Sequence, residues 1–343
     1  MRAIGILLLA AATALSFAGC ASSRQSSSQS QRVQAAAKPS AVAGLCKSPD
    51  VPPANLVHEP GYQQFDVSVT DASGQPISGL TRQDFIVYND SRSFPVAYFR
   101  EHKDDQPVTI ALVVDTSGSM VPKLPIVKQS LGNLVQNLNR CDEVILYAFS
   151  GHPLLLMPFT TDHKMTAEKM ELFHAYGQTA IYDAASTALQ SLAVADYPDR
   201  AIILITDGMD NASIAEEKDV VEQARNDGVQ IYAVGIGDPN AKGYRDVAIG
   251  PYIIGMDNSN RVDAKSLKEL SESAGGRSFI VPATAEDGGK GIKDAISAIA
   301  NNIAQGYAIG AVIPADARPS TVMVTVANRP DLIVRAHPIA TSQ

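Results

Sequence analysis

The hydrophobic positions between about residues 107 and 305 follow two alternating patterns. Continuous apolar runs occur at Val108–Val114, Val144–Phe149, Ala201–Ile205 and Val229–Val234. Between them, apolar residues recur at helical spacing, for example at Val127, Leu131, Leu134 and Leu138. Continuous runs are typical of parallel strands buried on both faces. The pattern therefore predicts an α/β domain with a doubly wound, mostly parallel sheet over residues 107–305. Leu154–Phe159 closely follows another strand, and we expect it to be an antiparallel edge strand.

Strand patterns also occur on both sides of this domain. Phe65, Val67 and Val69 alternate with polar residues, which indicates a half-buried strand in an N-terminal β module over residues 61–106. Strand-like runs return in residues 306–343, at Tyr307–Ile313, Thr321–Val326 and Leu332–Ala336. The N-terminal set has too few strands to be stable alone. We therefore expect the N- and C-terminal strands to pair into one small flanking β-sandwich.

The first 60 residues have no pattern typical of a globular domain. Residues 1–19 combine a positive start, an apolar run and small residues at the end, which is typical of a secretory signal peptide. The apolar run is shorter than the roughly 20 residues of a transmembrane helix. Residues 20–60 begin with Ser/Gln-rich sequence that has too few apolar residues to fold, and they are predicted to be a flexible tether.

The end of the signal peptide contains a short recognisable motif. Phe17-Ala18-Gly19-Cys20 resembles the bacterial lipobox, although Leu is preferred at position 17. The resemblance implies cleavage before Cys20 and attachment of lipid to its thiol. Ala21 then favours sorting to the outer membrane. An ordinary secretory signal that happens to end near a cysteine is the alternative. We expect an extracytoplasmic protein that contacts the membrane through its lipid anchor only.

The net charge argues against one class of function, and the cysteines allow two states. The net charge of −8 argues against nucleic-acid binding, which needs a basic face. Besides Cys20, the chain contains Cys46 and Cys141, which could form a disulfide in an oxidising compartment. Two unpaired buried thiols are the alternative.

Enzymatic function is not supported by any motif in the sequence. The six histidines lack zinc-site spacing, and no G-x-S-x-G motif is present. Asp115 follows a strand, as a phosphatase nucleophile would, but position 117 is Ser where such enzymes need a second Asp as general acid. We therefore expect neither catalysis nor a small-molecule substrate.

Oxygen-bearing side chains occur where strands of the predicted sheet end, and on one loop that precedes a helix. Asp115, Ser117 and Ser119 follow the first strand, Thr179 lies on the loop, and Asp207 follows the strand Ala201–Ile205. Ligands of open α/β sheets bind at the carboxyl ends of the strands. Carboxylates and hydroxyls are the hard ligands that Mg²⁺ requires. The pattern predicts a Mg²⁺ site at this edge.

The same five residues resemble a known motif. The sequence D-x-S-x-S…T…D resembles the metal-ion-dependent adhesion site (MIDAS) of the von Willebrand factor type A (VWFA) domain, and the flanking strands resemble those of bacterial VWFA-related proteins. The resemblance implies that Asp115, Ser117, Ser119, Thr179 and Asp207 hold Mg²⁺ or Mn²⁺. It further implies an open coordination position, which an acidic side chain of a partner protein completes.

The connection from Asp238 to Asp263 is unusually long for an α/β domain and rich in apolar residues. Our hypothesis is that it contributes partner specificity beside the metal. A small hairpin that packs its own apolar residues is the alternative.

The sequence thus predicts a lipid-anchored protein-binding module. Two other functions remain open, a structural envelope lipoprotein whose metal only stabilises the fold and an assembly factor for an envelope complex.

Overall fold

The computed structural model describes residues 46, 50–90, 92–102, 106–241, 261–282, 289–314, 316 and 322–339, and the backbone of residues 244–249 and 252–257. Cys20, the signal peptide and the beginning of the tether lie outside the described residues.

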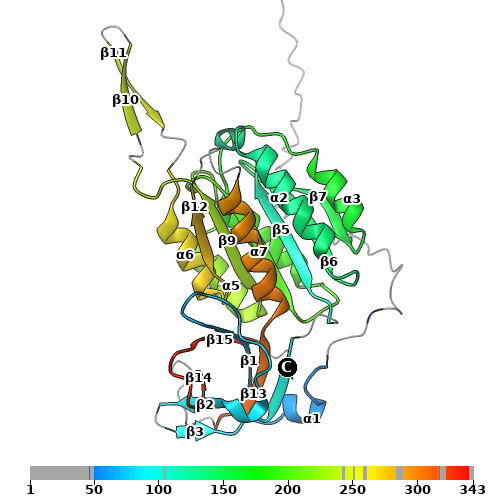
Figure 1. Ribbon diagram of the computed structural model, residues 1–343. Coiled ribbons are helices and arrows are strands. Elements are labelled where there is room, and N and C mark those ends of the chain that lie inside the picture. The colour runs from blue at the N-terminus through cyan, green and yellow to red at the C-terminus, as the bar shows by residue number, and fades with distance from the viewer. Residues whose placement is uncertain are drawn as a thin grey trace, which may run out of the picture. The chain divides into compact units, whose positions relative to one another are not determined.

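A six-stranded sheet forms the centre of the α/β domain (Figure 1), with the strand order β12-β9-β8-β5-β6-β7. The first five of these strands are parallel to one another, and β7 pairs antiparallel with β6 at the edge. The strands are β5 (Thr109–Asp115), β6 (Glu143–Phe149), β7 (Pro153–Thr160), β8 (Arg200–Thr206), β9 (Gln230–Ile236) and β12 (Ser278–Val281). The predicted doubly wound sheet and its antiparallel edge strand are confirmed.

Two layers of helices explain the continuous apolar runs. Ile110, Leu112 and Val114 of β5 belong to one hydrophobic core, and Ala111 and Val113 belong to another on the opposite face of the sheet. The first core includes residues of α2 (Leu124–Asn137), α3 (His163–Met170) and α7 (Lys290–Ala304). The second includes residues of α4 (Ile181–Leu192), α5 (Glu217–Asp227) and α6 (Ala264–Ser273).

The terminal strands form the predicted flanking β module. One sheet has the order β15-β1-β13-β4 and the other has the order β14-β2-β3. Apolar residues of both sheets form a separate core, in which the rings of Phe85 and Tyr307 have centroids 4.9 Å apart. The strands are β1 (Tyr62–Thr70), β2 (Phe85–Asn89), β3 (Arg92–Phe94), β4 (Tyr98–Glu101), β13 (Tyr307–Val312), β14 (Val322–Val326) and β15 (Ile333–Ile339).

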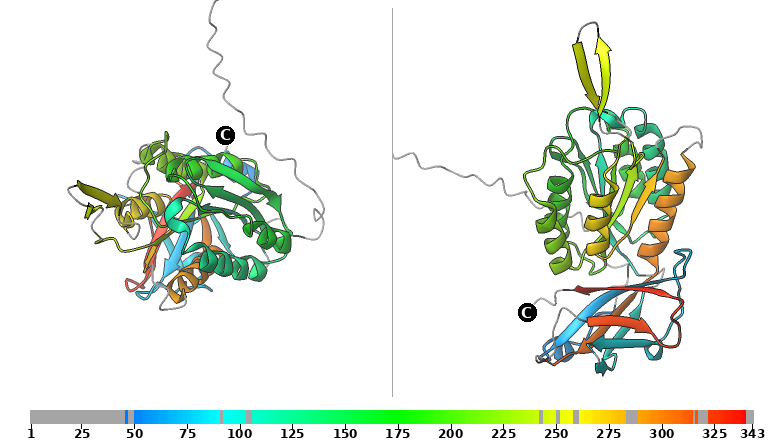
Figure 2. Two further views of the ribbon diagram at one scale, coloured as in Figure 1. Left: turned by 90° about the horizontal axis from the view of Figure 1, so that it is seen from above. Right: turned by 90° about the vertical axis from the view of Figure 1, so that its left-hand side faces the viewer.

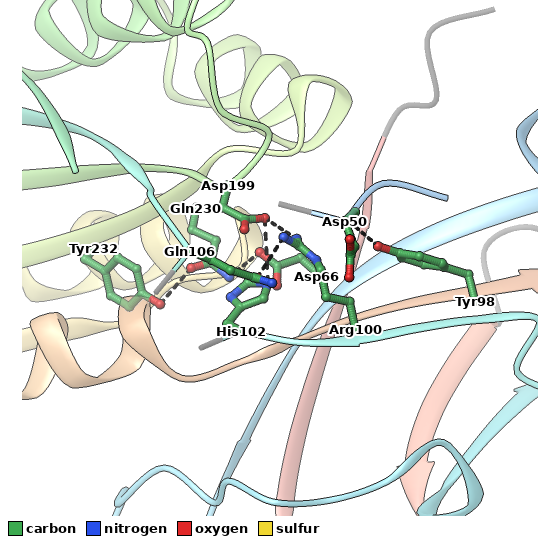
Figure 3. A network of polar contacts seen from close by, with 9 residues as sticks. All are labelled: Asp50, Asp66, Tyr98, Arg100, His102, Gln106, Asp199, Gln230 and Tyr232. Carbon is green, nitrogen blue, oxygen red and sulfur yellow. Dashed lines mark hydrogen bonds and ion pairs between the residues drawn. The ribbon is translucent and has the colours of Figure 1, made fainter. Parts of the chain in front are cut away.

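A polar network joins the β module to the α/β domain (Figure 3). Asp66 of β1 accepts a hydrogen bond from Nε2 of Gln230 in β9 at 2.6 Å, and Arg100 of β4 pairs with Asp199, just before β8, at 2.6 Å. These contacts lie at the amino ends of the parallel strands. The carboxyl ends of the strands therefore face away from the β module.

Residues assigned to the tether also contact the folded region. Cys46 forms a disulfide with Cys141, so the structure has the bridged form of the two alternatives. The carbonyl of Asp50 accepts a hydrogen bond from the Tyr98 hydroxyl at 2.5 Å, and α1 (Ala54–Val57) precedes β1.

The long connection after β9 contains an antiparallel hairpin, β10 (Tyr244–Ile249) and β11 (Tyr252–Asp257). It extends from the end of the sheet opposite the β module (Figure 2). Its side chains lie outside the described residues. Within the described part of the chain, no helix is long and apolar enough to cross a membrane.

Candidate metal centre

The loop after β5 begins the site. Asp115 is the last residue of β5, and its Oδ1 accepts a hydrogen bond from the Ser117 amide at 2.7 Å. This contact folds the chain back on itself, and a short 3₁₀ turn, η2 (Gly118–Met120), follows. The turn brings the Ser117 and Ser119 hydroxyls to 3.2 Å from each other. The spacing of two residues therefore gathers these side chains at one point.

A second loop, before α4, carries Thr179. Gly177 has a φ of +79°, a conformation that favours glycine, and its carbonyl accepts a hydrogen bond from the Gly118 amide at 3.3 Å. Thr179 and Asn211 exchange two hydrogen bonds, each of 2.9 Å. Backbone contacts thus fix the Thr179 loop against the loop that carries the two serines.

The end of β8 completes the arrangement. Thr206 donates its hydroxyl to Asp115 Oδ2 at 2.6 Å, and Ser119 donates its hydroxyl to Asp207 Oδ1 at 2.7 Å. The Thr179 hydroxyl lies 3.4 Å from the point where a Cβ on Gly208 would stand, so it is next to the residue after Asp207. The structure brings all five predicted residues together at the carboxyl edge of the sheet.

Both carboxylates of the site are removed from solvent. Asp115 and Asp207 are each 0% exposed, whereas Ser119 is half-buried and Gly118 is exposed. Burial, together with the charge of Asp207, raises the pKa of Asp115 to about 6, against the lowering effect of the Thr206 and Ser117 hydrogen bonds. A buried pair of carboxylates needs positive charge nearby to be stable. The exposed side of the site is therefore the turn around Gly118 and Ser119.

One positive charge of the site comes from the protein itself. The ammonium of Lys123 lies 2.5 Å from Asp207 Oδ2, and the Lys123 residue is only 5% exposed. The two oxygens of Asp207 thus have different partners, the Ser119 hydroxyl and the Lys123 ammonium.

The donor set fits a small divalent cation. Two carboxylates and three hydroxyls supply oxygen only, which suits Mg²⁺ or Mn²⁺ and not the softer metals that prefer Cys or His. The Ser119 hydroxyl lies 3.2 Å from the Ser117 hydroxyl and 2.7 Å from Oδ1 of Asp207. Asp115, Ser117, Ser119, Thr179 and Asp207 are the residues that would hold such an ion.

Exposed apolar side chains lie close in sequence to the site residues on all three loops. Val121, two residues after Ser119, is 60% exposed. Tyr176 and Met209, on the loops of Thr179 and Asp207, are 57% and 38% exposed. We call these three residues the apolar rim.

Three polar residues of the site were not predicted from the sequence. Thr206 and Asn211 act through hydrogen bonds to Asp115 and Thr179, and Lys123 acts through its ion pair. Thr206 and Asn211 carry no spacing signal, because small polar residues are common in any strand-to-helix loop. Lys123 gave one usable signal, a charge between the apolar residues Val121 and Leu124.

The sequence is similar to a known domain family over more than half of its length. The family described as the von Willebrand factor type A domain matches residues 109–298. The uncharacterised protein YfbK of Escherichia coli (strain K12) is 26% identical over 166 residues, or 46% of this chain and 28% of YfbK. The chain thus matches less than a third of that relative.

Solved structures with a similar arrangement have low sequence identity. A von Willebrand factor type A protein from Catenulispora acidiphila is 12% identical with a TM-score of 0.48, over 82% of this chain and 74% of that one. Proximal thread matrix protein 1 of the mussel byssus, described with a zinc-occupied MIDAS motif, is 15% identical with a TM-score of 0.47, over 61% and 50% of the two chains. BatB from Bacteroides thetaiotaomicron is 22% identical with a TM-score of 0.44, over 56% and 98%.

Proposed function

This chain belongs to the von Willebrand factor type A domain family, and on that premise we propose that it is a metal-dependent protein-binding module. Mg²⁺ or Mn²⁺ is held by Asp115, Ser117, Ser119, Thr179 and Asp207. The ligand is a carboxylate on a partner protein. The observation that carries this proposal is the gathering of five oxygen-bearing side chains at the edge of the sheet that faces away from the β module.

The charges of the site favour an anionic ligand. When bound, the metal would supply positive charge and an open coordination position for an outside oxygen. Asp115, Asp207 and Lys123 together carry one net negative charge, so a divalent cation leaves the group with one net positive charge. A carboxylate on the partner would neutralise it. The protein's own contribution is to orient the hydroxyls and to keep the aspartates out of water.

The apolar rim indicates which residues we expect on the partner's binding surface. Val121, Tyr176 and Met209 expose apolar area on the loops that carry the site residues. Aromatic and Met side chains are enriched at the centres of protein interfaces. We therefore expect the partner's acidic residue to be flanked by apolar residues. The β10–β11 hairpin extends from the same end of the sheet and would provide a further contact (Figure 1).

A catalytic role is not part of this proposal. The oxygens of Asp115 accept hydrogen bonds from Ser117 and Thr206, which leaves this carboxylate poorly placed as a nucleophile. The family resemblance and the binding geometry both fit recognition of a partner better than bond cleavage.

We also propose that the chain acts outside the cytoplasm, attached by lipid at Cys20 to the outer membrane. The Cys46–Cys141 disulfide supports the location outside the cytoplasm, because disulfides persist in oxidising compartments. The lipid attachment rests on the resemblance of Phe17–Cys20 to the lipobox.

The test is metal-dependent capture of partners from an envelope extract. Wild-type protein, Asp115→Ala and the matched control Asp331→Ala, whose carboxylate is exposed and paired with Arg329, are compared in Mg²⁺ and in EDTA. We expect a partner retained in Mg²⁺ by the wild type and by Asp331→Ala, and lost in EDTA and in Asp115→Ala. If Mg²⁺ raises the melting temperature but every captured protein survives both treatments, the metal is structural and the proposal is wrong.

A further inference from the structure

Lys123 occupies a position where a lysine is unfavourable for two reasons. It is the residue that precedes α2, where the positive end of the helix dipole repels a cation. Its side chain is also only 6% exposed, although lysine is among the residues least often buried. A residue with both disadvantages needs a strong compensating interaction. The ion pair with Asp207 supplies it.

The two oxygens of the Asp207 carboxylate have different bonding partners. Oδ2 accepts from the Lys123 ammonium at 2.5 Å, and Oδ1 accepts from the Ser119 hydroxyl at 2.7 Å. Oδ1 is therefore bonded to a hydroxyl of the proposed metal site, and Oδ2 is bonded to the lysine. The lysine also places a positive charge next to Asp207, which is one of the proposed metal ligands.

We propose that Lys123 is a tethered second cation of the metal centre, which orients Asp207 and sets the net charge of the site. This inference rests on the proposed function, since it concerns the same metal. With Lys123, the metal-loaded site carries one net positive charge; without that lysine, the charge would be zero. Lys123 thus weakens metal binding and strengthens carboxylate binding. It makes occupation of the metal position depend on the partner.

Metal affinity is the first measurement. Titration calorimetry with Mn²⁺ compares the full-length wild type with Lys123→Gln and Lys123→Met. The Gln amide can still donate a hydrogen bond to Asp207 Oδ2 but has no charge, so this variant separates charge from packing. Lys128→Met is the matched control, because Lys128 lies on α2, which Lys123 precedes, and pairs with Glu171 instead of with a residue of the site. We expect Lys123→Gln to bind Mn²⁺ roughly tenfold more tightly, because a like charge is removed, and Lys128→Met to match the wild type.

Carboxylate affinity is the second measurement, with acetate as the probe. Acetate is titrated into each Mn²⁺-loaded protein, and its displacement of metal-bound water is followed by water proton relaxation. Lys123→Gln should bind acetate several-fold more weakly than the wild type and Lys128→Met.

The results for Mn²⁺ and acetate distinguish a failure of the proposed role of Lys123 from a failure of the proposed metal-dependent function. If the wild type binds Mn²⁺ and Lys123→Gln has the same affinity for Mn²⁺ and acetate, the role of Lys123 is wrong and the metal centre stands. If the wild type binds no Mn²⁺, the metal centre itself fails, and the inference fails with it. If Lys123→Met is unfolded without metal, recovery of its fold in Mn²⁺ supports the proposed role of Lys123. If Lys123→Met does not recover and Lys123→Gln behaves as the wild type does, the proposed role is wrong.

Discussion

At the scale of single residues, the metal ligands could be predicted from the sequence, and the residues that bond to those ligands could not. The five ligands were predicted because they bear oxygen, follow strands or precede a helix on one loop, and match the D-x-S-x-S…T…D motif. Thr206 and Lys123 contact the two aspartates directly, but the sequence does not show that they lie beside Asp115 and Asp207. A ligand motif can be read along the chain, whereas its hydrogen-bonded supports depend on which strands are neighbours.

His337 of the β module is half-buried, and its shifted pKa gives a pH-dependent prediction. Burial, and then the charges of Arg225 and Arg335, lower the pKa of His337 to about 4 from 6.5. Below pH 6.5 the unfolded chain takes up a proton that the folded chain excludes, so stability falls as the pH drops from 6.5 to 4. The loss from this group is about 3 kcal/mol at most.

Urea denaturation at pH 7 and at pH 4.5 tests this account of His337. His337→Gln, which cannot titrate, should lose less stability between these two pH values than the wild type, by about 2 kcal/mol. Equal losses in the two proteins would show that His337 is not the group responsible.

At the scale of secondary-structure elements, long apolar patterns were predictable and short elements were not. The strands β5, β6, β8 and β9 lie within two residues of the predicted ranges, because burial on both faces leaves a continuous apolar run. The four-residue strand β12 was missed because it is too short to show any pattern. Helix α3 ends at Met170, and the buried Phe173 lies beyond it.

Two glycines of the α/β domain should respond in opposite ways to substitution by alanine. Gly132 lies inside α2 with nothing within 4 Å of its potential Cβ, so Gly132→Ala should stabilise the protein by about 1 kcal/mol. A Cβ on Gly276 would lie 2.0 Å from the carbonyl oxygen of Ile231, so Gly276→Ala should cost several times as much. Thermal denaturation of both variants checks this, and a destabilised Gly132→Ala would contradict the account of α2.

At the scale of the whole molecule, the chain leaves the β module, forms the α/β domain and returns to complete the same module. Strand β1 lies between β13 and β15, so residues from both ends of the chain share one sheet. The sequence allowed this to be predicted, since the N-terminal set of strands could not be stable alone. The polar network of Figure 3 could not be predicted, because its members come from β1, β4, β9 and the loop before β8.

The disulfide should be a major source of stability for the folded region. It joins Cys46 to Cys141 across a sequence separation of 95 residues, which corresponds to roughly 4–5 kcal/mol of lost unfolded-state entropy. The double variant Cys46→Ser, Cys141→Ser should lose about this free energy of unfolding in urea, while Cys20→Ser should lose none. A double variant as stable as the wild type would mean that the bridge does not constrain the unfolded chain.

The proposed function requires a divalent cation among the five oxygen-bearing residues. Crystals of the full-length protein grown with Mn²⁺ test it most directly, through an anomalous difference map recorded near the manganese absorption edge. We expect one strong peak in contact with the Ser117 and Ser119 hydroxyls and beside Asp115 and Asp207, and no such peak in crystals of Asp115→Ala. A wild-type map without a peak at these residues, or with manganese bound only elsewhere, would contradict it.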